Sequence, residues 1–480
     1  MTLVLKDLLA QTDPTIAHAG LAIAGATADS RNVKAGDAFF ALPGTVTHGA
    51  DHAAAAAQRG AAVIVSDRPV EGVGALPQVV VADVRAAFAR AMARLWHPQP
   101  EVLVGVTGTN GKTSVAGFVR QMWEASGIPA ASVGTLGIET AAGLAAGSLT
   151  TPDPETLHKS LNRLEAGGVQ HVVMEASSHG LDQRRLDGIR FNVVGYTNLS
   201  QDHLDYHVDM SEYREAKLRL FRDLLAPDGA AVVNTDDPEH LPFLFAALDR
   251  GVTLLTVGTE GAYFEISSVE AQGFGQKVRG RLVGEPVEFL LPLAGRFQVD
   301  NAAMAVALAI QSGADPAKTI DALNRLRGAR GRLELAGGRG GAAVFVDYSH
   351  KPLALQAALQ TLRPFTRKRL IVVFGCGGDR DRGKRPIMGE IASRLADIVI
   401  VTDDNPRTED AARIRTEILA AAPRAREIAS RAEAIDVAVG ELGDGDVLLV
   451  AGKGHEDYQI VGTKKRHFSD FEEVVRALSS

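Results

Sequence analysis

A glycine-rich stretch near residue 110 carries the residue types of a phosphate-binding loop. Glycines stand at positions 105, 108 and 111, and Lys112 and Thr113 follow directly. In such loops the backbone N–H groups at a helix start bind phosphate, the lysine reaches the β- and γ-phosphates, and the hydroxyl ligates Mg²⁺. The common pattern has glycine five residues before Gly111, where this chain has Val106, so the loop is a variant. A plain glycine-rich turn is the alternative.

The residues on either side of this loop predict the elements that it requires. Val102 to Val106 is a short apolar run, typical of a buried strand. From Thr113 to Gly127 apolar residues recur at helical spacing, which indicates a helix with one buried face. Strand, loop and helix in this order favour nucleotide binding over a plain turn.

Glu175 and Lys217 are charged residues in apolar surroundings. Glu175 ends a predicted strand, where open α/β sheets bind their ligands, so it could serve Mg²⁺ or its water shell. The alternative is a glutamate that caps the next helix. Lys217 lies on the apolar stripe of a helix predicted from Met210 to Ala226. It could extend its amine to water, or be buried with a lowered pKa and so be reactive.

Two polar stretches leave their roles open. Asp202, His203, Asp205 and His207 lie close together, but their spacing matches no zinc pattern, and a polar loop beside a nucleotide is the favoured interpretation. Ser30 and Arg31 could hold a phosphate or lie in a polar turn.

The last third of the chain repeats one pattern, in which an apolar strand ends in charged or glycine-rich residues. The four stretches that follow these strands are residues 347–350, 376–385, 403–407 and 452–456. The second stretch is basic, through Arg380, Arg382, Lys384 and Arg385, and suits anions. The glycine cluster at 337–341 predicts a turn, because no helix follows it.

Strands alternate with helices along the chain, which predicts an α/β protein. At 480 residues the chain is too long for one ordinary domain. We expect three, at residues 1–98, 99–330 and 331–480. Residues 263–292 predict an antiparallel excursion, and Asn301 stands just before a helix predicted from Ala302 to Gly313.

Composition and charge narrow the class of partner. Hydrophobic residues make up 46% and charged residues 23%, as in ordinary globular enzymes. The net charge of −7 argues against broad nucleic-acid binding. Cys376 is the single cysteine, which fits a reducing compartment. No signal peptide is recognised at the start, and no apolar run approaches the ~20 residues of a membrane-spanning helix. A cytoplasmic protein without membrane insertion is expected.

At this point the chain resembles the Mur ligases over nearly its whole length, and most of all those that add the third residue of the peptidoglycan stem peptide. Ten stretches carry the resemblance, in order: residues 105–113, 150–154, 174–180, 197–207, 213–221, 331–334, 347–350, 375–385, 403–407 and 452–456. The resemblance implies a small N-terminal α/β domain for a UDP-sugar peptide. A central P-loop ATPase with a mostly parallel sheet and a Rossmann-like C-terminal domain would follow, in a monomer.

The resemblance also assigns residues to ligands. Catalytic positions would be Lys112, Glu175, Lys217 and His203, with Thr113, Glu175 and a carbamate on Lys217 as the Mg²⁺ ligands. ATP would contact Gly108, Thr109, Asn110, Gly111, Lys112, Thr113, Ser114, Asn301, Arg332 and Asp347. The substrate UDP-MurNAc-L-Ala-D-Glu would contact Ser30, Thr150, Thr151, Ser177, Gln183 and Arg185. Ser349 and Lys351 depart from the family, which more often has Ala and Thr there.

The implied reaction is an amide ligation driven by ATP through an acyl phosphate. The incoming amine would contact Arg380, Asp404, Asn405, Pro406, Arg407, Gly452 and Glu456. In the family, Asp404-Asn-Pro-Arg407 is the form found in enzymes that add meso-diaminopimelate. A guanidinium can hold the second carboxylate of that amine with two parallel hydrogen bonds, and lysine has no such carboxylate. Glu456 would accept from the distal amine.

Three alternatives remain at this stage. A lysine-adding ligase of the same fold would need Arg407 to point elsewhere. Folylpolyglutamate synthetase shares the ATPase but lacks this first domain and the Asp404-Asn-Pro-Arg407 stretch. A non-catalytic nucleotide sensor on the same fold would not need Lys112, Glu175 and Lys217 intact.

Overall fold

The computed structural model describes residues 3–10, 18–44, 47–145, 147 and 149–479, which form two compact units. Unit 1 comprises Met1–Ala262 and Met304–Thr319, and unit 2 comprises Tyr263–Ala303 and Ile320–Ser480. Both are α/β, so the predicted class is confirmed. Within the described ranges, no helix has the length and apolar character needed to cross a bilayer. The predicted absence of a signal peptide concerns the start of the chain, where Met1 and Thr2 lie outside the described ranges.

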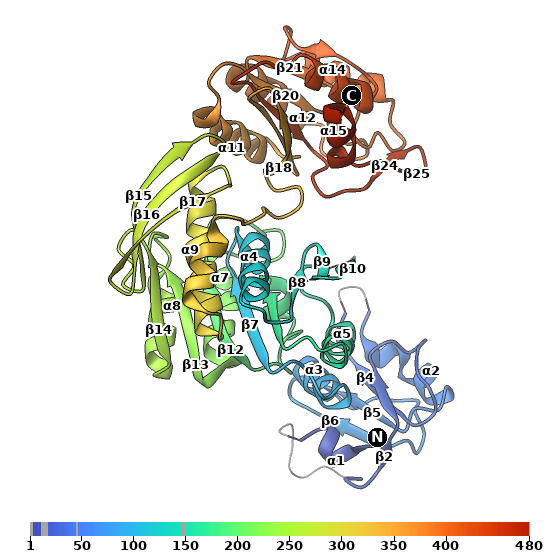
Figure 1. Ribbon diagram of the computed structural model, residues 1–480. Coiled ribbons are helices and arrows are strands. Elements are labelled where there is room, and N and C mark those ends of the chain that lie inside the picture. The colour runs from blue at the N-terminus through green and yellow to red at the C-terminus, as the bar shows by residue number, and fades with distance from the viewer. Residues whose placement is uncertain (1–2, 11–17, 45–46, 146, 148, 480) are drawn as a thin grey trace. The chain divides into compact units, whose positions relative to one another are not determined.

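The N-terminal part of unit 1 contains a four-stranded parallel sheet in the order β3-β4-β5-β6. Helices α2 and α3 both contact β4 (Figure 1). Alternate residues of β4 point to opposite faces, so Phe40 packs with helix α3 and Phe39 packs with helix α2. Asp83 caps the start of α3. The elements here are β1 (Leu3–Val4), α1 (Leu5–Leu8), β2 (Ala22–Ile23), β3 (Gly25–Thr27), β4 (Asp37–Ala41), η1 (Gly49–His52), α2 (Ala53–Gln58), β5 (Val63–Ser66), β6 (Gln78–Val80) and α3 (Val84–Leu95).

The central part of unit 1 is a mostly parallel sheet with the strand order β10-β9-β8-β11-β7-β12-β13-β14. Its parallel strands are β7 (Val102–Thr107), β8 (Ala130–Gly134), β11 (His171–Glu175), β12 (Phe191–Tyr196), β13 (Leu225–Asn234) and β14 (Thr253–Gly258), and β9 (Gly137–Thr140) and β10 (Gly143–Ala145) pair antiparallel. Helix α4 (Lys112–Ala125) packs on β7, β8 and β11. The hydrophobic core of the sheet also includes residues of α5 (Pro154–Ala166), α6 (Ser178–Asp182), α7 (Met210–Arg219) and α8 (Leu241–Arg250).

Two predicted helix boundaries are wrong. The helix expected to run to Ala226 ends at Arg219, continues as a π-helical turn, η2 (Leu220–Leu224), and gives way to β13 at Leu225. Leu220, Phe221 and Leu224 are all buried, because the wider π turn keeps them on the apolar side. The helix expected at Ala302 is α9 (Arg296–Gln311), which starts earlier and therefore contains Asn301.

Unit 2 begins with the predicted antiparallel excursion, which is confirmed. It is the meander β15 (Phe264–Gln272), β16 (Gly275–Leu282) and β17 (Glu285–Leu291). Helices α9 and α10 (Pro316–Leu323) follow in the chain.

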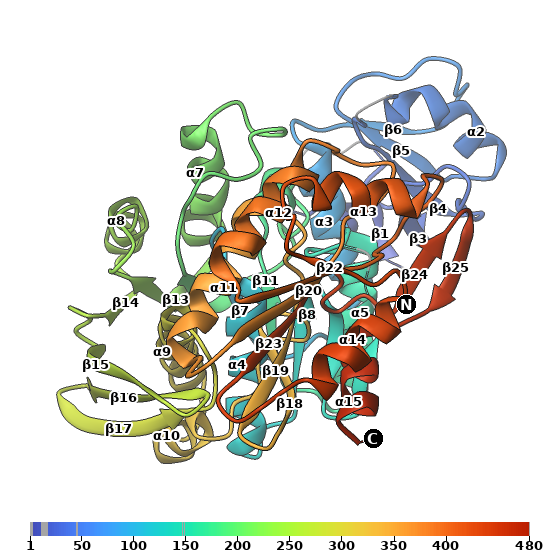
Figure 2. The ribbon, with the colours of Figure 1, turned by 90° about the horizontal axis from the view of Figure 1, so that it is seen from above.

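The rest of unit 2 is a six-stranded sheet with helices on both faces, shown from above in Figure 2. Its order is β18-β19-β23-β20-β21-β22, parallel except for β18. Helices α11, α12 and α13 cover one face, and α14 and α15 cover the other. The elements are β18 (Glu334–Arg339), β19 (Ala342–Asp347), α11 (Pro352–Leu362), η3 (Arg363–Phe365), β20 (Leu370–Phe374), α12 (Lys384–Leu395), β21 (Ile398–Val401), α13 (Ala411–Leu419), β22 (Arg426–Glu427), α14 (Arg431–Gly440), β23 (Val447–Ala451), β24 (Tyr458–Val461), β25 (Lys464–His467) and α15 (Asp470–Ser479).

The predicted turn at the glycine cluster 337–341 is shorter than expected. Gly337 and Gly338 lie within β18, which shifts register there, and only Gly340 and Gly341 form the turn into β19.

A buried ion pair between Arg431 and Asp470 joins α14 to α15. Arg431 donates to both carboxylate oxygens, at 2.6 and 2.7 Å, and to the carbonyl of Ala451 at 2.9 Å. We expect Arg431→Ala to lower the free energy of unfolding by about 3–5 kcal/mol, because it leaves a buried carboxylate without its cation. Urea unfolding measures this change, and the double variant Arg431→Met/Asp470→Leu should recover most of it. A loss below 1 kcal/mol in the single variant would contradict this role.

Candidate active site

The predicted phosphate-binding loop lies between β7 and α4, as the sequence indicated (Figure 1). Gly108 has φ of 147° and Gly111 has φ of 86°, which glycine adopts without strain. A Cβ on Gly108 would overlap the hydroxyl of Thr197, so the loop approaches the neighbouring strand too closely for any side chain. The loop backbone is fixed by Asn198, whose side chain accepts from the N–H of Asn110 at 3.0 Å. The glycines and Asn198 therefore determine the backbone conformation of this loop.

Lys112 and Lys217 both donate to the carbonyl oxygen of Gly108. The Nζ of Lys112 lies 2.8 Å from this oxygen, and the Nζ of Lys217 lies 2.9 Å from it. Lys217 also sits over the ring of Tyr213, 4.4 Å from its centroid, and the Tyr213 hydroxyl lies 3.1 Å from Thr109 Oγ1. Helix α7 thus brings a second lysine onto the phosphate loop, from more than one hundred residues further along the chain.

The side chain of Lys217 is buried rather than extended to water. Its exposed fraction is 1%, so the interpretation of a lysine whose amine reaches solvent is wrong. Burial, and then the positive charge of Lys112, lower the pKa of Lys217 well below its usual range. A lowered pKa increases the fraction of neutral amine, which is the form that reacts. The position of Lys217 on an apolar helix face was the sequence signal for this property.

Glu175 is buried at the carboxyl end of β11, beside the first turn of α4. Its carboxylate accepts from Thr113 Oγ1 at 3.0 Å and from the N–H of Thr135 at 2.8 Å. Burial raises the pKa of Glu175, and Lys112 partly opposes this effect. The alternative of a helix cap is wrong, because Ser177 caps α6.

The oxygen groups of Thr113 and Glu175 suit a magnesium ion. A hydroxyl and a carboxylate lie 3.0 Å apart at one point of the loop, and Mg²⁺ typically takes one or two carboxylates together with water and phosphate oxygens. Lys217 fits such a site only as an anion, because an ammonium group would repel the ion. In the part of the chain that the structure describes, no three His, Cys, Asp or Glu side chains are grouped as a metal site.

The close packing of Gly134 against Glu175 gives a test of this geometry. A Cβ at position 134 would overlap the carboxylate of Glu175. We expect Gly134→Ala to displace that carboxylate and lower kcat about 10- to 100-fold, because small displacements of positioning groups are costly. Gly117→Ala in α4 is the control, since no described atom outside its own helix lies within 4 Å of the new methyl group. Equal kcat values for the two variants, with both proteins folded, would contradict the role of Glu175.

The residues that the resemblance assigned to the UDP-sugar peptide are largely brought together. Thr151 Oγ1 donates to the carbonyl of Glu175 at 2.8 Å and lies 2.9 Å from Ser177 Oγ. Arg185 donates to the carbonyl of Thr151 and to the Gln183 side chain, both at 2.7 Å. Thr150 is linked to the same region through Thr135 at 3.0 Å. Five of the six predicted residues are therefore linked into one polar network.

Ser30 lies apart from this network, in the N-terminal sheet domain. It sits in a turn where Arg31 forms an ion pair with Asp29 at 2.8 Å. Its contact with a phosphate stays a prediction.

His203 lies on the loop before α7. Its ring is 4.9 Å from that of His179 and 6.1 Å from that of Tyr213, whose ring also contacts Lys217. This arrangement agrees with a polar loop near the phosphate loop, and a role beside the ions stays a prediction.

In unit 2, Asp347 is buried at the carboxyl end of β19. It accepts from the N–H groups of Leu333 and Ser349, at 2.7 and 2.8 Å, and from the Ser349 hydroxyl. Burial raises the pKa of Asp347, while these donors oppose the increase. Arg332 stacks on the ring of Tyr348, 5.2 Å from its centroid. Asn301 is buried in α9. Their contacts with ATP stay predictions.

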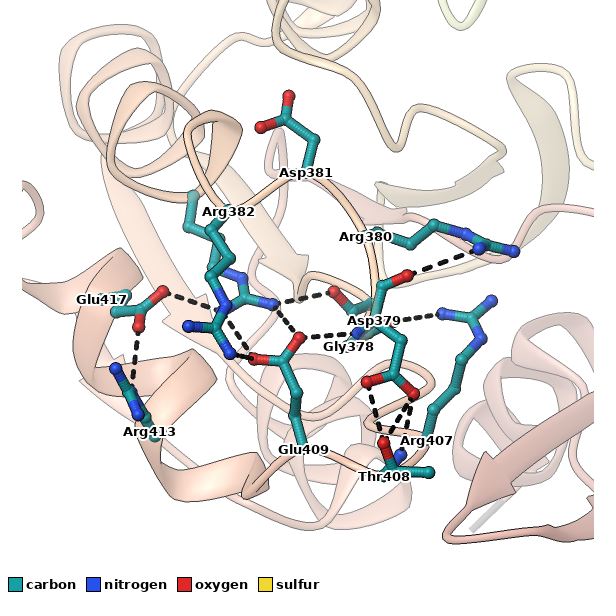
Figure 3. Close-up of polar contacts among 12 residues, drawn as sticks. Gly378, Asp379, Arg380, Asp381, Arg382, Arg407, Thr408, Glu409, Arg413 and Glu417 are labelled. Carbon is teal, nitrogen blue, oxygen red and sulfur yellow. Dashed lines mark hydrogen bonds and ion pairs between the residues drawn. The ribbon is translucent and has the colours of Figure 1, made fainter.

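Arg407 follows β21 and lies against the glycine-rich loop after β20. Its backbone has φ of 52°, which is unusual for a residue with a side chain, and backbone hydrogen bonds to Ile460 and from Gly462 hold it there. Its guanidinium donates to the carbonyl of Gly378 at 2.8 Å. Figure 3 shows the guanidinium groups of Arg407 and Arg380 extending to the same side of the loop.

The interpretation of the loop 376–385 as a general anion site is largely wrong. Arg385 is fully buried and pairs with Glu409 and Glu417. Arg382 also pairs with Glu409 (Figure 3). Lys384 donates to the carbonyl of His350 at 2.8 Å. Among the residues that the structure describes, Arg380 donates only to the carbonyl of Asp379, at a long distance of 3.4 Å, which leaves the rest of its guanidinium for a ligand.

Comparison with known proteins gives matches along nearly the whole chain. Models of three domains match: "Mur ligase family, catalytic domain" over residues 22–96, "Mur ligase middle domain" over 106–309, and "Mur ligase, glutamate ligase domain" over 331–454. UDP-N-acetylmuramoyl-L-alanyl-D-glutamate–2,6-diaminopimelate ligase from Mesorhizobium japonicum is 52% identical over 464 residues, which are 96% of each chain.

The chain belongs to the Mur ligase family.

Two further proteins match this Mur ligase over 99% or more of its length. The ligase of the same name from Bradyrhizobium diazoefficiens is 50% identical and covers 99% of each chain. A solved structure of a protein with that name is 32% identical, with a TM-score of 0.79, and covers 100% of this chain and 99% of its own. The predicted α/β architecture of three domains is confirmed, and the chain is a ligase. The alternatives of a non-catalytic sensor and a folylpolyglutamate synthetase are therefore wrong, whereas the predicted domain boundaries stay predictions.

Sequence reasoning missed a buried cation beside Glu456 in this Mur ligase. Lys453 is fully buried, and its Nζ lies 3.4 Å from Glu456, 3.3 Å from Asn405 and 3.6 Å from Asp404. Asn405 also donates to Glu456 at 3.0 Å. Lys453 and Asn405 therefore orient the carboxylate of Glu456. The pattern Gly452-Lys-Gly-His-Glu456 contained the signal, because it places a lysine three residues before the glutamate.

Proposed function

We propose that this Mur ligase joins meso-2,6-diaminopimelate to UDP-MurNAc-L-Ala-D-Glu, with ATP hydrolysed to ADP and phosphate. The observation that supports this substrate most directly is Arg407, which is held with its guanidinium on the same side of the loop as that of Arg380. Relatives that are named for addition of 2,6-diaminopimelate to this UDP-sugar peptide match nearly the full chain.

In the first step, a carboxylate oxygen of the D-glutamyl residue attacks the γ-phosphorus of ATP. The bond from this phosphorus to the β,γ-bridging oxygen breaks, and ADP leaves. The glycine-rich loop and the start of α4 hold the phosphates, and Lys112 leaves its carbonyl partners to neutralise the charge that develops on them. The product of this step is an acyl phosphate.

In the second step, the neutral amine of diaminopimelate attacks the acyl carbon. The bond from this carbon to the phosphate oxygen breaks, inorganic phosphate leaves, and the nitrogen loses a proton. The protein contributes mainly position, because the acyl phosphate is itself reactive. The network of Thr151, Ser177 and Arg185 would hold the peptide.

Lys217 would act after conversion to a carbamate. Its neutral amine adds to CO₂ and loses a proton, which replaces a cation beside Lys112 by an anion. Thr113, Glu175 and this carbamate would then hold Mg²⁺, which when bound offsets the negative charge of the phosphates. The lowered pKa of Lys217 favours the reaction, because only the unprotonated amine adds to CO₂.

The incoming amine would be selected by charge at its distal end. Arg407 and Arg380 would bind the distal carboxylate, and Glu456, Asp404 and Asn405 would accept from the distal ammonium group. Lys453 balances one of the two carboxylates in this set, so an excess negative charge remains for the substrate. L-Lysine satisfies the acceptors but leaves the guanidinium groups without a partner.

We also propose a cellular compartment for the reaction. UDP-sugar precursors of peptidoglycan and ATP are both cytoplasmic metabolites, so we place the enzyme in the cytoplasm. We also propose that the enzyme acts as a monomer.

Isotope transfer tests the proposed mechanism. With ¹⁸O in the reacting carboxylate of UDP-MurNAc-L-Ala-D-Glu, one labelled oxygen should appear in the phosphate released with each new amide bond. Unlabelled phosphate, with the label retained in the amide product, would contradict an acyl phosphate. Ligation without consumption of ATP would contradict the proposed function as a whole.

A further inference from the structure

Glu409 is a charged side chain that connects two loops of the proposed amine site. It stands two residues after Arg407, and only 11% of its side chain is exposed. One carboxylate oxygen accepts from the N–H of Asp379 at 2.6 Å, and the other accepts from Arg382 at 2.8 Å. The Arg407 segment is thereby tied to the glycine-rich loop that carries Arg380 (Figure 3).

Arg385 anchors this carboxylate to the body of the domain. It is fully buried in the first turn of α12 and donates to both oxygens of Glu409, at 3.0 and 3.2 Å. Arg385 also donates to Glu417 at 2.7 Å and to the carbonyl of Gly377 at 3.2 Å. The hydrogen bonds from Arg385 lower the pKa of Glu409 to about 2, so this side chain remains ionised at neutral pH.

A second set of contacts joins the same two loops. The Thr408 hydroxyl donates to the carboxylate of Asp379 at 2.8 Å, and the Thr408 N–H donates to it at 3.1 Å. Asp379 and Arg407 have φ of 54° and 52°, so each loop contains a residue in a conformation that its own chain disfavours. Contacts with neighbouring segments hold both backbones in place: Glu409 and Thr408 contact Asp379, and backbone hydrogen bonds with Ile460 and Gly462 hold Arg407.

We propose that Glu409 is a positioning residue that sets the direction of Arg407, and so selects an amine with a distal carboxylate over its decarboxylated analogue. The hydrogen bond from Arg407 to Gly378 depends on the position of the Gly378–Asp379 backbone, which Glu409 holds through the N–H of Asp379 and Asn405 holds through the N–H of Gly378. This inference rests on the proposed function, because it concerns the same amine site.

The test compares Glu409→Gln with Glu417→Gln in the full-length enzyme. The first change places an amide NH₂ group against two arginines and loosens the loop. We expect the KM for meso-diaminopimelate to rise about 10- to 100-fold, as expected for a displaced binding group. The KM for ATP and the saturated kcat should change less than threefold. Glu417→Gln removes the same charge from Arg385, but among the described residues Glu417 pairs with Arg385 and Arg413 and not with the Gly378–Asp379 backbone or with Thr408. It should change the KM for the amine less than threefold.

Comparison of two amines distinguishes a loss of Arg407 positioning from a general loss of activity. With Glu409→Gln, kcat/KM should fall for meso-diaminopimelate and stay unchanged for L-lysine, which has no distal carboxylate for Arg407. Equal losses for the two amines, or a KM for meso-diaminopimelate equal to that of the unaltered enzyme, would overturn the inference. If the unaltered enzyme does not ligate meso-diaminopimelate, the proposed function fails instead.

Two milder variants serve if Glu409→Gln does not fold. Glu409→Asp keeps the charge and should recover most of the selectivity. Thr408→Val removes only the hydroxyl contact with Asp379 and should shift the selectivity in the same direction by a smaller factor. Unchanged selectivity in folded Thr408→Val would overturn the inference.

Discussion

Replacement of Lys217 by alanine should lower kcat by at least about 10²- to 10³-fold, as for other groups that stabilise charge in a transition state. The side chain is buried on the carbonyl of Gly108, beside Lys112, where a carbamate would supply a ligand for magnesium. Steady-state phosphate release at saturating ATP, Mg²⁺, UDP-sugar peptide and amine measures the effect. The half-buried, ion-paired Lys159 on α5 is a control, and Lys159→Ala should leave kcat within twofold of the unaltered value.

Isotope labelling tests the carbamate on Lys217 directly. Enzyme prepared under ¹³C-labelled CO₂ should show one carbamate carbon signal that Lys217→Ala lacks. Full activity in Lys217→Ala would contradict both the carbamate and the assigned metal site. Activity of the unaltered enzyme without a carbamate signal would contradict the carbamate alone.

Replacement of Arg407 by alanine should lower the ratio of kcat/KM for meso-diaminopimelate to that for L-lysine by up to about 10⁴-fold, because a binding site built around a polar contact discriminates strongly against an analogue that lacks it. Position 407 has a left-handed backbone conformation, which is equally unfavourable for arginine and for alanine. The substitution therefore removes the guanidinium with little change in backbone strain. Competition between the two amines, read as product masses, gives the ratio directly.

Arg413→Ala is the matched control for this change. Arg413 is mostly exposed on α13 and contacts Glu417, at the edge of the same ionic network. Its loss should alter the ratio less than threefold. If Arg407→Ala also leaves the ratio unchanged, Arg407 does not bind the distal carboxylate, and another group must select the amine.

Local patterns predicted the residues of the phosphate loop well. The spacing of Gly108, Gly111, Lys112 and Thr113 fixes a strand, a turn and a helix, since these residues are neighbours in the chain. Burial of Lys217 was one of the two alternatives that the sequence predicted, because a charged residue interrupts an apolar helix face. The choice between them required the structure, since the partner on the loop is distant in sequence.

Contacts between loops that are distant in the chain could not be predicted from the sequence. The basic residues after β20 suggested an anion site, whereas Glu409 and Glu417, which neutralise Arg382 and Arg385, come from a later part of the chain. The π-helical turn after Arg219 was missed for a different reason. Its apolar residues continue a helical pattern, and only the start of β13 ends the helix there.

Phosphate release with four amines tests the central claim most directly. The unaltered enzyme would be supplied with ATP, Mg²⁺, UDP-MurNAc-L-Ala-D-Glu and, in turn, meso-diaminopimelate, LL-diaminopimelate, L-lysine and L-ornithine. The arrangement of Arg407, Arg380 and Glu456 predicts release with meso-diaminopimelate, and little or none with L-lysine and L-ornithine. Release with L-lysine at a rate equal to or above that with meso-diaminopimelate would contradict it.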